Sequence, residues 1–505
     1  MSKFRTGGKR QASILGLILF LLLLNVYGQA QVGQTKDGQT SAGESPATTQ
    51  PTPQPSAQPA TSSTGEERKI SPQEAEKLFR SVDEILQFAS KDTLYPIKRE
   101  VNRQLVSRDE VEAYVTKHTS EDEDAKRLRR SELVLKKFGL LPRDFDLGTF
   151  LVALLKEQVA GYYDPKTKTV NLLDWLGAEQ QKPVLAHELT HALQDQSFNL
   201  EKYMKPGGAD LARKKEITAQ DVENDEVSTT RQAVVEGQAM VVLVDYMLEP
   251  MGLSVKDSPQ VVQGLKDSML VGIADSVQFR NAPIYMKEAL TFPYRYGIDF
   301  IADLMIKGGK DKAFADLFRN PPRTTRQIME PQTYLSGERL EPMNVPDFRQ
   351  VFKNYERFDV GAVGEFDVAV LIDQYAGTQI SNKLYPDWRG GYYYAVRIKG
   401  NPNAPLGLLY ASRWSSPEKA ANFAAIYASA LNKRYLHVQD VFEAGKEPPV
   451  PTEALDHLTG KRAWLTEQGR VVIAVQGETV VATESLDQAT SDSLEQEVFG
   501  AVVAK

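Results

Sequence analysis

Two histidines four positions apart, His187 and His191, enclose Glu188 in the segment His-Glu-Leu-Thr-His. In a helix, residues four apart differ by about 40° around the axis, so both imidazoles would leave the same face one turn apart. Two ligands of one tetrahedral zinc ion need this arrangement. Glu188 would lie beside that face, close to a water molecule at the metal without being a ligand. The spacing favours a zinc site over the alternative of two core histidines that bind nothing.

A third protein ligand is expected, and Glu236 is the best candidate. It stands in the apolar segment Val234–Ala239, where an unpaired carboxylate would cost several kcal/mol. A cation at the position of the zinc ion would remove that cost. A solvent-facing or salt-bridged glutamate is the alternative. The remaining acidic side chains near this segment are weaker candidates: Glu223, Asp225, Glu226 and Asp245.

The elements that must position these residues are two helices. The first is expected to begin at Pro183, because proline suits the first helical position, and to bury Leu185, Leu189 and Ala192 opposite the histidines. The second is expected to begin at a capping box formed by Thr229 and Gln232. The polar residues 202–226 before it are expected to form a loop or surface insertion.

Two residues near the ligands suggest supporting roles. Gly237 costs about 1 kcal/mol relative to alanine in a helix interior, which predicts close packing of its helix against the helix that carries His187. Asp195 follows His191 by one turn and is a candidate acceptor for an imidazole N–H. An ordinary surface aspartate is the alternative for Asp195.

Composition excludes several classes of function. The 505 residues carry a net charge of −7, so the chain lacks the basic surface that nucleic-acid binding requires. The chain has no cysteine, which excludes disulfides, thiolate metal sites and a cysteine nucleophile. Any transition metal must therefore be held by His, Asp or Glu. The length exceeds one ordinary domain and predicts about three segments.

The N-terminus resembles an export signal. A basic start precedes the apolar stretch from Ile14 to Tyr27, and Gly28-Gln29-Ala30 supplies a small-residue cleavage pattern. The apolar stretch is short for a membrane span of about 20 residues, and an uncleaved N-terminal anchor is the alternative. The following Pro-, Ser-, Thr- and Gln-rich residues lack large apolar side chains and predict a disordered tether.

Regular structure is expected from Ile70 onward, where apolar residues recur at helical spacing. Residues 161–172 predict two short strands around the turn at Asp164-Pro165. After about Asp359 the pattern mixes strands, at 391–398, 471–475 and 479–482, with a helix at 416–431. This pattern predicts a separate α+β domain.

The two-histidine helix followed by a glutamate on a later helix resembles the gluzincins, the thermolysin-like zinc metallopeptidases. More narrowly, the chain is similar to a group of exported bacterial proteins that share five stretches: His187 to Gln196, Val235 to Gly237, Tyr162 to Pro165, Phe292 to Gly297 and Pro321 to Ile328. The chain departs from that group at 324–331 and 389–392. These departures leave the zinc residues unchanged but bear on substrate handling.

The resemblance implies an α+β fold: a mainly helical zincin-like metallopeptidase core with a small edge sheet, followed by a C-terminal α+β domain. The expected organisation is a signal peptide (1–30), a disordered linker (31–66), an N-terminal helical region (67–130), a zincin-like catalytic domain (131–355) and the C-terminal domain (356–505). The strand around Val170 to Leu173 would be the edge that pairs with an extended peptide.

The implied activity is hydrolysis of peptide bonds by an exported, periplasmic or extracellular enzyme that holds one Zn²⁺ per chain through His187, His191 and Glu236. Zinc polarises a carbonyl and lowers the pKa of a water molecule to about 7, and Glu188 would be the general base. Tyr294 and Arg231 are both candidates for stabilising the oxyanion. The substrate would be a peptide or protein, and no nucleic acid or membrane partner is expected apart from the N-terminal segment. A catalytically weak zinc-site scaffold of the cell envelope and an amidase of cell-wall peptides are the alternatives.

Overall fold

The computed structural model of the chain describes residues 69–119, 122–158, 161–204, 211–257, 260, 262–264, 276–442 and 450–503. The predicted signal peptide or anchor and the predicted linker, residues 1–66, lie outside this range. No helix within the described ranges combines the length and the apolar character that a membrane span requires.

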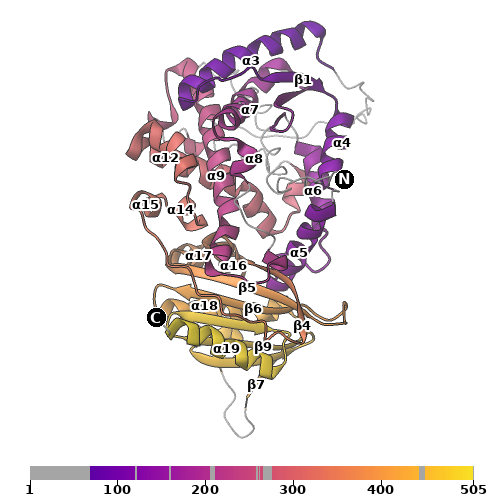
Figure 1. Cartoon of the computed structure of the whole chain (residues 1–505), viewed down its shortest axis with the longest axis vertical. Helices are drawn as coiled ribbons and strands as arrows, with labels where there is room; N and C mark the ends of the chain where they lie inside the picture. Colours follow the sequence, from indigo (N-terminus) through magenta and orange to yellow (C-terminus); the bar gives the residue numbers. More distant parts are fainter. Residues whose placement is uncertain are drawn as a thin grey trace, which may run out of the picture.

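The chain is a mixed α+β structure, with helices in the upper part of Figure 1 and a large sheet in the lower part. The helices that precede the large sheet are α3 (Pro72–Thr93), α4 (Arg108–Thr119), α5 (Asp122–Phe138), α6 (Leu147–Gln158), α7 (Ala178–Phe198), α8 (Leu200–Tyr203), α9 (Ala219–Leu248), α11 (Val277–Arg280), α12 (Ile284–Ala313), α13 (Ala315–Arg319), α14 (Thr325–Met329) and α15 (Pro331–Leu335). Helix α3 confirms the helical pattern after Ile70, and its apolar face, including Leu78 and Val82, is buried.

The C-terminal part contains a seven-stranded antiparallel sheet in the order β4-β5-β6-β10-β9-β8-β7. Its strands are β4 (Tyr355–Ala362), β5 (Trp388–Ile398), β6 (Gly407–Trp414), β7 (Val438–Val441), β8 (Gly460–Thr466), β9 (Gly469–Gln476) and β10 (Thr479–Glu484), and its helices are α16 (Glu365–Ala376), α17 (Thr378–Leu384), α18 (Pro417–Arg434) and α19 (Gln488–Val503). The three strands and the helix predicted after Asp359 are confirmed. The domain boundaries stay a prediction.

A small second sheet has the order β1-β3-β2, with β1 (Asn102–Val106), β2 (Tyr162–Asp164) and β3 (Thr169–Leu173). The predicted hairpin is confirmed, because β2 and β3 pair in antiparallel fashion. The prediction that the Val170–Leu173 strand is an edge is wrong. Strand β1 pairs with it in parallel from the other side, so β2 is the edge strand on the hairpin side. The short, polar β1 gives no period-two pattern that predicts this pairing.

Both helices that carry the predicted ligands begin earlier than expected. Helix α7 begins at Ala178 and includes Pro183 in its interior. Its start is held to β3 by the Gln181 side chain, which bonds the backbone N–H and carbonyl of Leu173. Helix α9 begins after a capping box formed by Thr218 and Asp221, not by Thr229. The prediction of a loop up to residue 226 is wrong for the first turns of α9, which are helical although their residues are largely polar.

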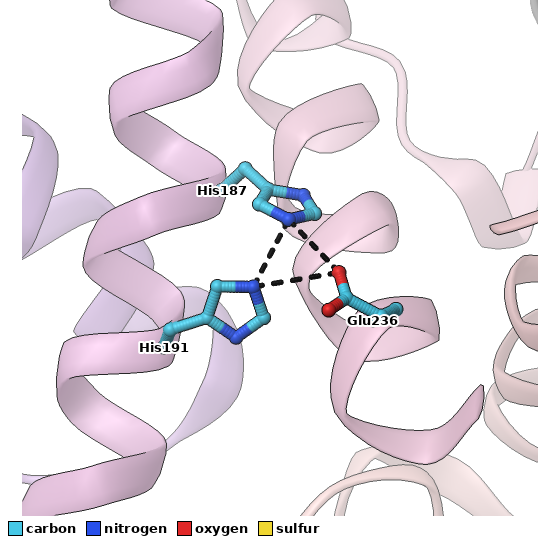
Figure 2. A group of neighbouring side chains, drawn as sticks. All are labelled: His187, His191 and Glu236. Atoms are coloured by element: carbon cyan, nitrogen blue, oxygen red, sulfur yellow. Dashed lines mark hydrogen bonds and ion pairs between the residues drawn. The ribbon is translucent and has the colours of Figure 1, made fainter. Parts of the chain in front are cut away.

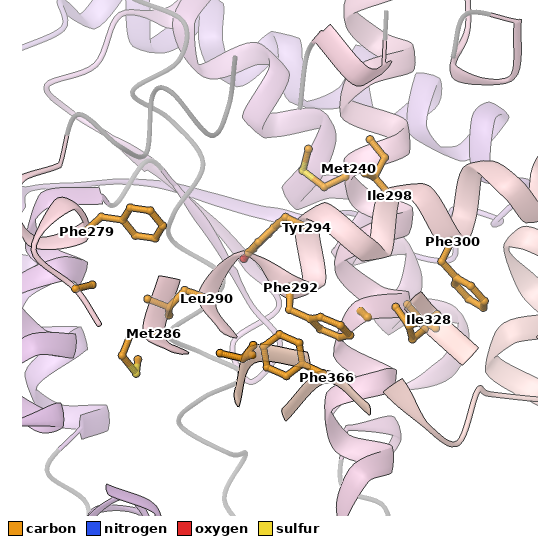
Figure 3. Packing of buried hydrophobic residues seen from close by; sticks show 14 of the residues in the cluster. Met240, Phe279, Met286, Leu290, Phe292, Tyr294, Ile298, Phe300, Ile328 and Phe366 are labelled. Atoms are coloured by element: carbon orange, nitrogen blue, oxygen red, sulfur yellow. The ribbon is translucent and has the colours of Figure 1, made fainter. Parts of the chain in front are cut away.

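Gly237 lies at a close approach between two helices, but its partner is α12 and not α7. A Cβ atom at Gly237 would lie 2.4 Å from the carbonyl oxygen of Gly297, and one at Gly297 would lie 2.5 Å from the carbonyl oxygen of Ala233. The prediction that Gly237 packs against the histidine helix is therefore wrong. Figure 3 shows the core around this crossing, where Met240 of α9 lies near Ile298 and Tyr294 of α12. The paired glycines set the distance between Glu236 and the residues of α12.

The Gly237→Ala variant should be less stable than wild type by about 1–3 kcal/mol, the usual cost of overpacking. The backbone carbonyl of Gly297 cannot rotate away, so the clash should outweigh the helix propensity that alanine gains. Gly500→Ala is the matched control, since that glycine is helical and exposed with open space around its Cβ position. Chemical denaturation would measure both variants. Equal stability of Gly237→Ala and wild type would contradict the tight crossing.

Candidate metal centre

Helices α7 and α9 bring three ligand-type atoms together, as Figure 2 shows. The Nε2 atoms of His187 and His191 lie 3.0 Å apart. The Oε2 atom of Glu236 lies 3.2 Å from Nε2 of His187 and 3.5 Å from Nε2 of His191. Among the His, Cys, Asp and Glu side chains of the described residues, these three lie close enough together to hold one metal ion.

The donor set fits a tetrahedral ion. Ligand atoms about 2.0–2.1 Å from one tetrahedral centre lie about 3.3 Å from one another, and the three observed separations fall on either side of that value. The side chains of all three residues are 2 % exposed or less. Oε2 of Glu236 makes no well-formed hydrogen bond to any described residue. A buried carboxylate is normally paired with a cation or a hydrogen-bond donor. A cation between Oε2 of Glu236 and the two imidazole nitrogens would supply that partner.

The electrostatics favour the protonation states that bind a metal. Burial lowers the pKa of His187, although the nearby Glu236 carboxylate acts in the opposite direction. Burial alone would raise the pKa of Glu236, but His191 and His187 outweigh it and the pKa is lowered. His187 is therefore neutral and Glu236 is a carboxylate near neutral pH. Both are the forms that coordinate metal ions.

Glu188 lies next to the three ligands and points toward the small sheet. Its Oε2 atom accepts a hydrogen bond of 2.8 Å from the backbone N–H of Tyr163 on β2. Burial raises its pKa well above the ordinary value, the negative charge of Glu236 adds to that effect, and the Tyr163 N–H opposes it. Leu185, Leu189 and Ala192 are fully buried on the other side of the helix, as predicted.

Of the two candidates for oxyanion stabilisation, Tyr294 is the one near the ligands. Its ring centroid lies 6.5 Å from that of His187. Its hydroxyl is buried and has no hydrogen-bond partner among the described residues. Burial, Glu236 and Glu188 raise its pKa, so it stays a protonated donor. Arg231 instead bonds the carbonyl of Tyr203 and stacks on its ring, so the structure does not bring it to the site.

The acceptor for the imidazole of His191 is not Asp195. The Asp195 carboxylate accepts hydrogen bonds from Tyr163 Oη, Lys168 Nζ and Arg99. Gln194 takes the predicted role, with its Oε1 atom 2.8 Å from Nδ1 of His191. Sequence reasoning missed Gln194, although its position three residues after His191 places it on the same helix face.

The four weaker ligand candidates make hydrogen bonds or ion pairs with residues other than the two histidines. Glu226 accepts hydrogen bonds from the backbone and hydroxyl of Thr325. Asp225 accepts one from the Ala362 N–H. Glu223 pairs with an arginine and Asp245 accepts from the backbone of the segment after α9. Glu226 and Asp225 thereby hold the start of α9 to α14 and β4.

Comparison of the chain with protein-family models, curated proteins and solved structures gives no match. The arrangement of the site is therefore the basis for any statement about function.

The Glu236→Ala variant should lose most of its zinc affinity, by more than about 100-fold, because even the loss of a residue outside the ligand shell costs 10–100-fold. Competition with a coloured chelator would measure the affinity, and elemental analysis would give one zinc per chain for wild type. Asp225→Ala and Glu226→Ala are the controls and should keep the affinity of the folded protein. Zinc binding that survives in Glu236→Ala would show that a different residue is the third ligand.

Proposed function

We propose that this chain is a zinc-dependent metallopeptidase in which His187, His191 and Glu236 hold one zinc ion. The observation that carries the proposal is the mutual spacing of 3.0, 3.2 and 3.5 Å among the three ligand atoms, with a carboxyl group of the right type beside them. When bound at this position, zinc supplies Lewis acidity toward a peptide carbonyl and lowers the pKa of a water molecule to about 7.

Glu188 acts as the general base and then as the acid. Its carboxylate takes a proton from the attacking water and passes it to the nitrogen of the leaving amine. The Tyr163 N–H holds one of its oxygens in place. A divalent cation beside Glu188 would favour the carboxylate form that this role requires.

Tyr294 donates a hydrogen bond from its phenolic O–H to the oxygen of the attacked carbonyl and keeps its proton. A buried hydroxyl without a partner is ready to donate when negative charge develops on that oxygen. Strand β2 supplies the surface for the peptide, because it is an edge strand of the small sheet and its Tyr163 contacts Glu188. An extended peptide could add to such an edge through its own backbone.

One observation favours a second candidate, a zinc-site scaffold of the cell envelope with weak or no catalysis. His187, Glu188, His191 and Glu236 are each 2 % exposed or less. A peptide must displace whatever covers them before its carbonyl can reach the site. For either candidate we infer export to the periplasm or the cell exterior from the N-terminal signal pattern of residues 1–30.

The Glu188→Gln variant separates the two candidates. Glutamine keeps the size of the side chain but cannot accept a proton, so peptide cleavage should fall by at least about 10²–10⁴ while zinc content and Tm stay near wild type. A quenched-fluorescent peptide library would measure cleavage. Glu179→Gln, on the exposed start of the same helix, is the control. Equal cleavage by wild type and Glu188→Gln would refute the role of Glu188. A zinc-loaded wild type that cleaves nothing would support the scaffold.

The Tyr294→Phe variant tests the hydroxyl alone. Removal of one oxyanion donor costs about 10²–10³ in kcat, and zinc affinity should not change because Tyr294 is not a ligand. Tyr203→Phe is the matched control, since that tyrosine is also buried with a hydroxyl that lacks a hydrogen-bond partner among the described residues. A normal kcat for Tyr294→Phe would exclude this donor role.

A further inference from the structure

Two glutamines, Gln194 and Gln238, form a fully buried pair of amides between helices α7 and α9. The Nε2 atom of Gln194 donates to the carbonyl oxygen of Val235 at 3.0 Å and to Oε1 of Gln238 at 3.0 Å. Val235 and Gln238 stand on either side of Glu236 in the sequence. The amide of Gln194 therefore connects the histidine helix directly to the backbone that carries the third ligand.

The orientation of both amides follows from their backbone partners. Nε2 of Gln238 faces the carbonyl oxygens of Ala313 and Phe314, at 2.8 and 3.1 Å. A carbonyl can only accept, so the amide nitrogen must occupy that side. Oε1 of Gln238 then accepts from Gln194 and from the hydroxyl of Tyr95 at 2.9 Å. All four amide protons of the two side chains are used.

The orientation of the Gln194 amide determines which ring nitrogen of His191 carries the proton. Because the Gln194 nitrogen is held by the Val235 carbonyl, its Oε1 atom is the one that faces Nδ1 of His191, at 2.8 Å. An amide oxygen can only accept, so Nδ1 must carry the proton. In the neutral ring the other nitrogen, Nε2, is then unprotonated. That nitrogen is the atom that lies 3.5 Å from Glu236 and 3.0 Å from His187.

We propose that Gln194 is the positioning residue of this centre: its amide, held in one orientation by Val235 and Gln238, fixes the His191 tautomer that presents an unprotonated Nε2 to the metal. The role rests on the metal site of the proposed function. The amide also differs from the carboxylate that often occupies such a position, because it adds no charge. The only negative charge among the three ligands and Gln194 is therefore that of Glu236. The amide N–H groups of Gln194 also connect α7 to α9, and a carboxylate has no such donors.

The test uses zinc affinity together with a readout on metal-free protein. Gln194→Met removes both the acceptor and the donors and should weaken zinc binding by about 10–100-fold. Gln194→Glu keeps an oxygen for the Nδ1 proton, so it should bind zinc more tightly than Gln194→Met while being less stable than wild type. Gln181→Met is the matched control, a buried glutamine of the same helix with three hydrogen bonds away from the ligands. It should lose stability without losing zinc affinity.

Long-range ¹⁵N NMR of the histidine rings in metal-free protein gives the tautomer directly. We expect the Nδ1–H form for His191 in wild type and in Gln194→Glu, and a mixture of tautomers in Gln194→Met. An Nε2–H form in wild type, or wild-type zinc affinity in Gln194→Met, would overturn the proposal. If wild type binds no zinc at all, the proposed function fails, whereas the tautomer measurement still decides the role of Gln194.

Discussion

A single carboxylate buried between two imidazoles organises the helical part of this protein. Glu236 and its neighbours in the helix are buried. Its Oε2 atom lies 3.2 and 3.5 Å from the two Nε2 atoms of α7. Such a charge is costly in a protein interior unless a cation compensates it. The packing of α9 against α7 therefore depends on how the charge of Glu236 is compensated. The space between its Oε2 atom and the two Nε2 atoms suits one cation.

The contacts around the three ligands hold them from three directions. Gln194 and Gln238 connect α7 to α9 through amides whose hydrogen bonds are all used. The glycine crossing of α9 and α12 lets Tyr294 approach from the other side. The backbone of β2 holds Glu188. These contacts come from different elements, so the geometry of the centre depends on the packing of α7, α9, α12 and β2 against one another.

The large sheet is connected to the centre through α9. Near the N-terminal end of α9, Asp225 accepts a hydrogen bond from the backbone at the end of β4, and Glu226 accepts one from the backbone at the start of α14. The same helix carries Glu236 further along. Burial raises the pKa of Glu226 to about 7, and its hydrogen bonds to Thr325 oppose this shift. Phe366 of α16 packs on Phe292 of α12 with ring centroids 4.6 Å apart, as Figure 3 shows. The C-terminal part therefore shares a continuous core with the helices around the candidate site.

Local chemistry was enough to predict several features from the sequence. Helical spacing placed His187 and His191 on one face, and the cost of a buried carboxylate singled out Glu236. The turn at Asp164-Pro165 predicted the hairpin, and local patterns predicted three of the seven strands of the C-terminal sheet. Those predictions depend on residues close in the chain, or on the cost of burying one group. The triad is confirmed as a spatial group by the structure, while its metal and its activity stay proposals.

The tertiary structure alone decided which residues surround that group. Strand β1 pairs with β3 although the partners, such as Asn102 and Thr169, are far apart in the sequence. No local pattern signals this pairing, which makes β3 the central strand. Gly237 needed a close neighbour, but only packing could show that the neighbour is Gly297. Likewise, Gln194 rather than Asp195 meets His191, because Asp195 is held by Tyr163, Lys168 and Arg99 from distant segments. The sequence carries the ligands themselves, whereas their orientation depends on contacts between elements far apart in the chain.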